Sequence, residues 1–385
     1  MRGLGASLVW GVGLTVMVGG APPAAAGSRA PSVLAGWREV WRDDFDGPAG
    51  SRLDPGSWQY DLGHCYQGCP AQNWGTGEVA EMTDSTDNVA LDGLGHLLIT
   101  PRRGPDGRWT SGRLESKRAD FAAAADGALR VEARLALPAV AGPAAQGYWS
   151  AFWMLGAAFR NGFVDPTGAG DVDVMEHVDT RPETVGAVHC QPVGAADPCQ
   201  EVPDNVGLAG TTTCPPAGCL NGFHTYTVEL HRESSPQRLD WLIDGAVYHS
   251  VPADQPGMDP TTWQLLITRS FFLILNQSIG GTWPGAPTAQ TQDGVPLVVD
   301  YVAVWVTAAD QHDERECDRS DDGDRSDRSD HSDDGDRSDR SDRSGRDAGH
   351  PLDHHVDHHV DHRVESGRGR AATVRGPSRA RASSH

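Results

Sequence analysis

The chain has 385 residues, of which 38% are hydrophobic and 22% charged, enough for one large domain with additional segments or for two domains. Its 53 acidic residues outnumber its 32 basic ones and give a formal net charge of -21, which argues against binding to a nucleic-acid backbone. The 46 glycines, 26 prolines and 12 tryptophans indicate a turn-rich β fold with aromatic surfaces and not a helical bundle.

The first 26 residues are typical of an export signal. Arg2 supplies a positive charge, residues 4–18 form an apolar run, and alanines at 24–26 offer a small-residue cleavage site. A membrane anchor is the alternative, but the run is shorter than the ~20 residues that a spanning helix needs. The sequence therefore predicts a signal peptide over residues 1–26, a linker over 27–36, and a secreted, extracellular protein with no membrane span after signal removal.

Export changes the interpretation of the seven cysteines. In an oxidising compartment, cysteines close together in sequence are more often disulfides than metal ligands. His64, beside the first pair, raises zinc as an alternative, but no second ligand pair follows at zinc-finger spacing. Pairing cysteines that are close in sequence predicts three disulfides: Cys65 with Cys69, Cys190 with Cys199, and Cys214 with Cys219. Cys317 then has no predicted partner.

Residues 37–306 have the pattern of strands and turns. Apolar and charged residues alternate over 129–137, which is the period of a strand with one buried face. Asp244-Gly245 indicates a hairpin turn, and no window has the length and amphipathic pattern of a helix. Further strand candidates cover residues 96–100, 225–231, 239–243 and 298–306. Many short strands in one unit predict an all-β sandwich of two antiparallel sheets.

The stretch from Gly170 to Glu176 alternates acidic and apolar residues. In a strand, Asp171 and Asp173 share one face, and a one-residue bulge at Met175 would bring Glu176 to that face as well. Three carboxylates on one face repel one another, which glycoside hydrolysis can use and a structural strand cannot. For this stretch alone, a calcium site or a solvated edge strand remains an alternative.

The spacing suits a pair of catalytic carboxyl groups. With the bulge, positions 171 and 176 are about four strand intervals apart, on the order of 13 Å between Cα atoms. Two glutamate side chains leaning toward each other would reduce this to the roughly 5–6 Å of a retaining glycosidase. Asp173 between them would help to keep one carboxyl protonated and the other ionised.

From about residue 308 the composition changes. Asp-Arg-Ser repeats extend from Asp318 to about Ser344, His-His-Val-Asp repeats follow near His354, and the end is rich in arginine. This stretch has almost no aliphatic or aromatic residues to offset the entropy of ordering it. A disordered low-complexity tail is therefore predicted over residues 308–385, with loose metal binding by its histidines as the alternative.

Motifs in order over residues 37–306 resemble glycoside hydrolase family 16, the laminarinase-like β-glucanases. The resembling segments are 41–45 (WRDDF), 53–54 with Trp58, 110–117 (TSGRLESK), 149–155 (WSAFWML), 170–176 (GDVDVME), 223–226, 244–245, 271–276, 280–285 (GGTWPG) and 299–302. The resemblance implies a concanavalin-like β-jelly-roll domain over residues 37–307 with a glycan cleft on its concave face. It also implies retaining hydrolysis of internal β-linkages of glucans or galactans. The bulged spacing is typical of members active on β-1,3-glucan.

The resemblance also assigns roles to residues. Position 171 corresponds to the nucleophile, Asp173 to the assisting residue and Glu176 to the general acid/base. Substrate-binding positions are matched by Glu78, Trp153, His189 and Trp283. Asp300 resembles an aspartate that helps to hold a structural calcium in some members, and no other cofactor is implied. Core packing is the alternative for Trp153 and Trp283, a structural role is the alternative for His189, and Trp58 and Trp241 are interpreted as core residues.

The chain departs from the family at its nucleophile, where Asp171 stands in place of glutamate. Losing one methylene retracts the carboxylate by roughly 1.3–1.5 Å, so the pair would be nearer ~7 Å apart, between the retaining and inverting separations. Three alternatives are consistent with this separation. The chain is a slow retaining enzyme, an inverting enzyme, or a module that binds glucan without cutting it. The leading hypothesis is a secreted, monomeric endo-acting hydrolase of β-1,3-glucan. The glucan-binding module is the alternative, and a purely structural exported domain is disfavoured.

Overall fold

The computed structural model of the protein describes residues 34–163, 166–179, 181–190, 207–215, 218–220 and 222–307, without the side chains of residues 166 and 167. The first strand begins at Trp37 and the last ends at Thr307. The predicted signal peptide and the predicted tail both lie outside the described residues.

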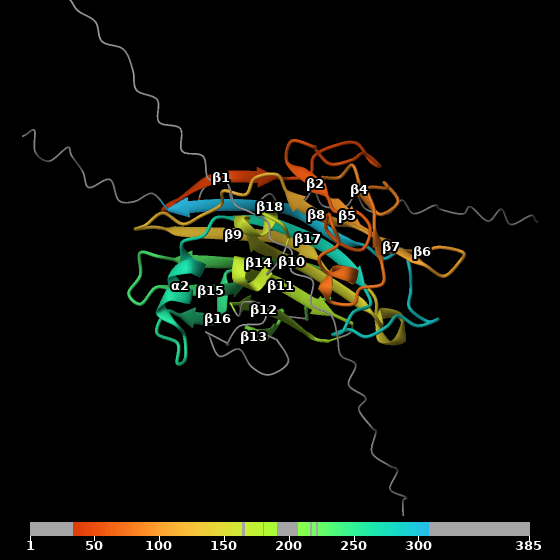
Figure 1. Cartoon of the computed structure of the whole chain (residues 1–385). Helices are drawn as coiled ribbons and strands as arrows, with labels where there is room; N and C mark the ends of the chain where they lie inside the picture. The colour runs from red at the N-terminus through yellow and green to blue at the C-terminus, as the bar shows by residue number, and fades with distance from the viewer. Residues whose placement is uncertain are drawn as a thin grey trace, which may run out of the picture. The chain divides into compact units, whose positions relative to one another are not determined.

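Two large antiparallel sheets make up the fold, as the sequence predicted (Figure 1). The eight-stranded sheet runs, in spatial order, β16 (Ala246–Pro252), β15 (Arg238–Ile243), β14 (Phe223–His231), β9 (Ala128–Ala136), β18 (Leu297–Thr307), β5 (Leu97–Ile99) and β4 (Val89–Leu91), with β1 (Trp37–Asp43) also paired to β18. The seven-stranded sheet runs β13 (Leu208–Thr213), β12 (Glu183–His189), β11 (Asp171–Val178), β10 (Tyr148–Gly156), β17 (Phe271–Ile279), β8 (Arg113–Ser116) and β2 (Trp58–Tyr60).

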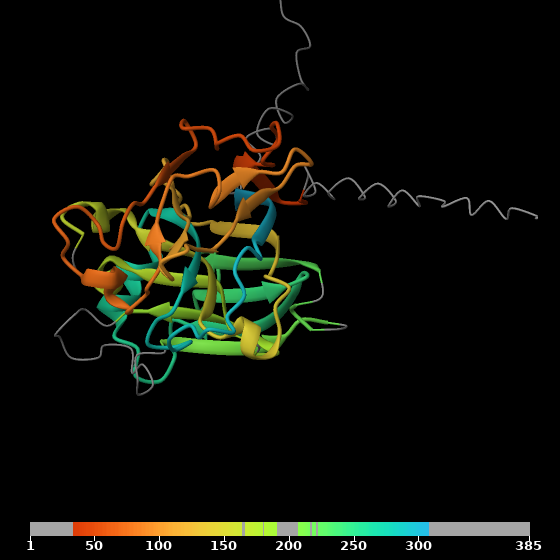
Figure 2. The same ribbon diagram turned by 90° about the vertical axis from the view of Figure 1, so that its right-hand side faces the viewer.

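A small third sheet and short helical segments complete the described part of the chain. The third sheet consists of β3 (Glu81–Met82), β7 (Trp109–Ser111) and β6 (Arg102–Arg103). The helical segments are η1 (Gln72–Gly75), η2 (Gly142–Ala145), η3 (Ala157–Arg160), α1 (Pro166–Ala169) and α2 (Pro260–Ile267). Figures 1 and 2 both show the orange N-terminal elements from β2 to β8 gathered on one side of the yellow and green strands.

Each strand predicted from alternation is present within one or two residues of its expected ends. Asp244 and Gly245 both have positive φ in the predicted hairpin between β15 and β16. The expectation of no helix was wrong at α2. This helix is capped by the Asp259 side chain and buries Trp263, Leu266 and Ile267. Its apolar spacing is helical, but eight residues are too few for a clear amphipathic window.

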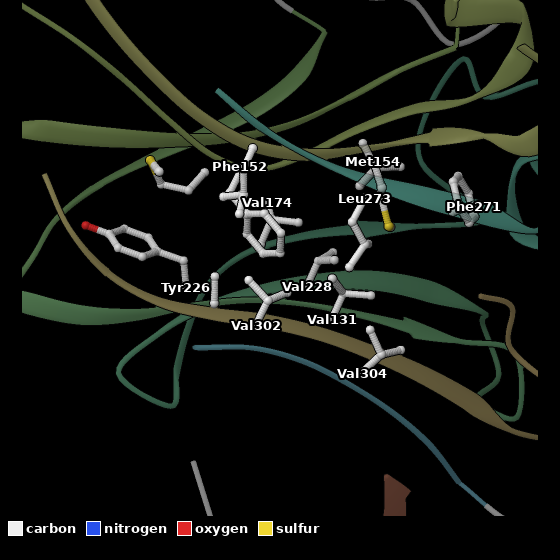
Figure 3. Close-up of a cluster of buried hydrophobic side chains, with 14 of the residues drawn as sticks. Val131, Phe152, Met154, Val174, Tyr226, Val228, Phe271, Leu273, Val302 and Val304 are labelled. Atoms are coloured by element: carbon white, nitrogen blue, oxygen red, sulfur yellow. The ribbon is translucent and has the colours of Figure 1, made fainter. Parts of the chain in front are cut away.

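The main core lies between the two sheets (Figure 3). Phe152, Met154, Val174 and Leu273 of the seven-stranded sheet face a layer of valines from the other sheet: Val131, Val228, Val302 and Val304. Trp58 and Trp241 are 1% and 0% exposed, so their prediction as core residues is confirmed. The side chains of the seven-stranded sheet that alternate with this core layer point away from the other sheet.

Trp241 connects the two sheets at the acidic strand. Its indole Nε1 donates a hydrogen bond to the backbone oxygen of Asp173, at a distance of 2.7 Å. The indole lies so close to β12 that a Cβ on Gly186 would be 2.3 Å from Trp241 Cδ1, so this position needs glycine. Trp241 of β15 therefore fixes the distance between the opposite sheet and strands β11 and β12.

Two predicted disulfides are present, Cys65–Cys69 and Cys214–Cys219. Cys190 is also disulfide-bonded. Its predicted partner Cys199 lies outside the described residues, as does Cys317, for which no partner was predicted. Within the described ranges, no helix has the length and apolar character to cross a membrane.

Trp241→Phe should lower the free energy of unfolding by about 2–4 kcal/mol, because it leaves a buried carbonyl without its donor and reduces the packing. Chemical denaturation measures this loss. Trp305→Phe is the matched control, since Trp305 is 1% exposed and its Nε1 has no hydrogen-bond partner in the described part of the chain. Its loss should be smaller by about 1–3 kcal/mol. Equal losses in the two variants would show that the hydrogen bond to Asp173 does not stabilise the fold.

Candidate active site

The predicted acidic motif forms β11, near the middle of the seven-stranded sheet between β10 and β12. Val172, Val174 and Met175 belong to the main core. Asp171 and Glu176 are half-buried, whereas Asp173 is 6% exposed. Since side chains alternate along a strand, the two aspartates lie on the face of the sheet that points away from the core.

A bulge brings Glu176 to the same face. On the β10 side, Phe152 pairs with Met175 while the next residue, Trp153, pairs with Asp173, so β11 carries one extra residue there. On the β12 side, the register also shifts between Asp173 and Glu176. Val174 and Met175 are consecutive, yet both are in the core. The bulge that the sequence predicted at Met175 is therefore present, and all three carboxylates share one face.

The electrostatics of Glu176 reflect this crowding. Burial raises the pKa of Glu176 well above its ordinary value, and the negative charges of Asp173 and Asp171 raise it further. A hydrogen bond from the Trp149 indole and the nearby His189 act in the opposite direction. A buried carboxyl with a raised pKa can act as an acid toward a leaving group.

His189, a predicted cleft residue, lies beside the two aspartates. It pairs with Asp171 in the register of β11 and β12, and its Nε2 is 3.4 Å from Oδ2 of Asp173. The imidazole is half-buried. This places His189 where a proton on its ring would act on Asp173 and Glu176 together.

A chain of hydrogen bonds joins two further predicted residues, Trp153 and Glu78. The Trp153 indole donates to Oδ1 of Asn276 at 2.8 Å, and the amide of Asn276 donates to the Ser278 hydroxyl at 3.0 Å. Ser278 in turn donates to Glu78, whose other oxygen accepts a bond from Thr76 at 2.9 Å. Glu78 is 4% exposed, and burial raises its pKa. Trp153 and Glu78 are thus parts of one network across β10 and β17.

Arg113 on β8 belongs to the same face but was assigned no role from the sequence. Its guanidinium carbon is 4.8 Å from the ring centroids of both Trp153 and Trp74. Its Nε donates to Asp61 at 3.0 Å and its Nη2 to the Tyr66 hydroxyl at 2.7 Å. This cation fixes the plane of the Trp153 ring, which is the surface that a pyranose ring can stack on.

Trp283 follows β17 and lies near Glu176, the last carboxyl group of the acidic motif. Its ring meets that of Trp149 edge to face, with 5.7 Å between centroids, and Arg181 lies 5.6 Å above it. A cavity of about 80 Å³ is bordered by Glu176, Arg181, Glu183 and Trp283, among other residues. Trp283 and Glu176 therefore face a common space.

Asp300 does not fit a calcium site. One of its oxygens accepts a hydrogen bond from Arg134, and the other is 3.9 Å from Nε2 of His96. Calcium takes six to eight oxygen ligands, whereas these neighbours present nitrogen donors. Among the described residues, no group of three or more His, Cys, Asp or Glu side chains is arranged to hold a metal ion.

Sequence reasoning brought together Asp171, Asp173, Glu176, His189, Trp153, Glu78 and Trp283, and the structure places all of them on or beside one face of the seven-stranded sheet. It missed Trp149 and Arg113. Trp149 is an even number of residues from Trp153 on the same strand, so strand alternation could have placed it on this face. Arg113 pairs with Asn276 in register, a contact that spans two distant segments.

Known proteins resemble the described part of the chain, although no family model matches it. A β-glucanase of Rhodothermus marinus is 30% identical over 276 residues, which cover 70% of this chain and 85% of the relative. The solved endo-1,3-β-glucanase of Streptomyces sioyaensis is 48% identical with a TM-score of 0.69, covering 73% of this chain and all of that one. A solved non-specific endo-β-1,3(4)-glucanase from family GH16 is 27% identical with a TM-score of 0.53, covering 73% and 99%.

The two sheets have the jelly-roll architecture of these glucanases. The chain therefore belongs to the β-glucanase family and is an O-glycosyl hydrolase.

Proposed function

We propose that the chain is a secreted glycoside hydrolase of family 16 that cleaves internal bonds of β-1,3-glucan with retention. The observation that carries the proposal is the bulged strand β11, which puts Asp171, Asp173 and Glu176 on one face. The order of the motifs along the chain supports the family, and the endo-1,3-β-glucanase relative supports the substrate. Galactans and other β-glucans are the substrates that a product analysis has to exclude.

In the proposed first step, the Asp171 carboxylate attacks the anomeric carbon while Glu176 gives its proton to the glycosidic oxygen. The bond to the leaving sugar breaks, and an ester to Asp171 forms. In the second step, Glu176 removes a proton from water, which attacks the same carbon and releases Asp171. The raised pKa of Glu176 suits the first step, and Asp173 at its side strengthens this preference for the protonated form.

Binding of the sugar would use the aromatic and polar groups around the acids. Trp153, held by Arg113 and Asn276, and Trp283 beside Glu176 offer ring faces for the apolar side of a pyranose. His189 and Glu78 offer polar contacts to hydroxyl groups. No step of this mechanism requires a metal or a cofactor.

Secretion is part of the proposal. It rests on the signal-like segment over residues 1–26 and on disulfides in the described domain, because disulfides persist in oxidising compartments. We also propose that the protein acts as a monomer, since the groups named above all come from one chain.

Asp171 favours one second candidate function, a glucan-binding module without turnover. A carboxylate set back by roughly 1.3–1.5 Å could fail to reach the anomeric carbon, and a misplacement of about 1 Å can cost about 100-fold in rate. Such a module would retain laminarin in a pull-down assay and release no reducing ends.

Glu176→Gln should lower kcat/KM for laminarin by about 100-fold or more, because general acid–base catalysis typically contributes 10²–10⁴. Reducing-end release measures the loss. The exposed Glu81 on β3 provides the control, since Glu81→Gln removes a carboxylate outside the acidic motif and should leave the rate unchanged. Equal rates for wild type and Glu176→Gln would exclude the proposed role of Glu176.

Asp171→Glu should raise kcat by about 10-fold or more, because it moves the nucleophile toward the sugar by roughly 1.3–1.5 Å. The product anomer, followed by proton NMR immediately after mixing, should be β in both proteins. Asp173→Glu adds the same methylene one position along the same face and should give no increase. A slower Asp171→Glu variant would indicate that the backbone already compensates for the shorter side chain, and an initial α product would contradict retention.

A further inference from the structure

We propose that Trp149 is a positioning residue for Glu176, whose carboxyl it orients through the indole N–H. This inference rests on the proposed function, because it concerns the general acid of that reaction. It gives a role to a tryptophan for which the sequence and the comparisons supply none.

The contact is direct. Nε1 of Trp149 donates a hydrogen bond to Oε1 of Glu176 at 2.9 Å. In the register of β10 and β11, Trp149 is opposite Val178, and Glu176 is opposite Ala151. The bond is therefore diagonal across the strand pair, over the small side chain of Ala151, and it depends on the bulge that turns Glu176 to this face.

The indole itself is fixed on two sides. Trp283 meets it edge to face at 5.7 Å. On its six-membered ring lies Gly281, where a Cβ would be only 2.9 Å and 3.0 Å from ring carbons Cζ3 and Cε3. Gly281 has a φ of +136°, so both the backbone conformation and the close approach require glycine. A donor held this firmly restricts the carboxyl rotamer in a way that a flexible side chain or a water molecule could not.

This arrangement gives the two carboxyl oxygens of Glu176 different roles. Oε1 accepts the indole N–H, which has no lone pair to accept a proton in return. Because a carbonyl oxygen accepts a hydrogen bond better than a hydroxyl oxygen, this bond favours the acidic proton on Oε2, and it is this oxygen that we expect to give the proton to the leaving group. The cavity between Glu176, Trp283 and Arg181 provides space beside the carboxyl for such a group.

The hydrogen bond from Trp149 also affects the pKa of Glu176. Burial and the negative charges of Asp173 and Asp171 raise the pKa of Glu176, while the Trp149 hydrogen bond and His189 lower it. Arg181, Glu183 and His177 border the cavity on which Glu176 opens. All of these charged and titratable groups remain when Trp149 is replaced by phenylalanine, so the change in the pH profile isolates the hydrogen bond.

Trp149→Phe keeps an aromatic ring against Gly281 and Trp283 but removes the donor. Because a bond to the ionised form is lost, the alkaline limb of kcat/KM on laminarin should move up by about one pH unit. Its plateau should fall by about 10-fold or more because the carboxyl is no longer oriented. The fall should be much smaller on an aryl β-glucoside of a laminari-oligosaccharide, whose leaving group needs little help from a general acid.

Trp58→Phe is the matched control. The Trp58 indole also donates to a carboxylate, Oδ2 of Asp43, at 2.7 Å, but it lies in the main core. This variant should be destabilised without a shift of the alkaline limb. If the limb of Trp149→Phe stays in place, or if its activity falls equally on both substrates, the proposal is overturned. The proposed function would still stand as long as Glu176→Gln is inactive.

A measurement on the wild type makes the test independent of how well Trp149→Phe folds. With 15N-labelled tryptophan, one indole N–H signal should shift with pH at the midpoint of the alkaline limb, moving downfield as Glu176 ionises. The same signal should not titrate in Glu176→Gln. An indole spectrum with no signal that follows this midpoint would contradict the proposal.

Discussion

The site depends on the extra residue in β11. Without it, strict alternation would turn Glu176 toward the core and separate it from Asp171 and Asp173. Two features stabilise the irregularity. Val174 and Met175 are both buried against the other sheet, so the bulge costs no hydrophobic contact. Trp241, from the opposite sheet, donates to the Asp173 carbonyl in the stretch where the ladder is disturbed.

The bulge brings three carboxyl groups together, and the surrounding groups determine the pKa of Glu176. Burial and two neighbouring aspartates favour a protonated Glu176, while Trp149 and His189 limit the effect. The protonated form of Glu176, which these neighbours favour, is the form that the proposed general acid needs. In the proposed mechanism, the short side chain of Asp171 reduces the reach of the nucleophile.

Local patterns made much of this predictable. Alternation identified the strands, the spacing from Asp171 to Glu176 required a bulge, and close cysteines identified Cys65–Cys69 and Cys214–Cys219. Helix α2 was missed because two turns give too little periodicity, and its packing against the main core stabilises it instead.

The supporting groups of the site could not be predicted in the same way, because their contacts join distant segments. Ser278 and Glu78 are 200 residues apart, and Arg113 reaches Asp61 across 52 residues. Trp149 and Glu176 are 27 residues apart, and the diagonal between them follows from a register that no local pattern fixes. The calcium expected at Asp300 came only from the resemblance, and the contacts of this carboxylate with Arg134 and His96 again join segments distant in sequence.

The most direct test of the central claim is to trap the intermediate. A laminaribioside with fluorine at C2 of the reacting sugar and a good leaving group should form a long-lived ester, because the fluorine slows its hydrolysis more than its formation. Mass mapping of the digested protein should find the added sugar on Asp171. A sugar on Asp173 or Glu176 would contradict the account, as would turnover of laminarin by a protein that never forms an adduct.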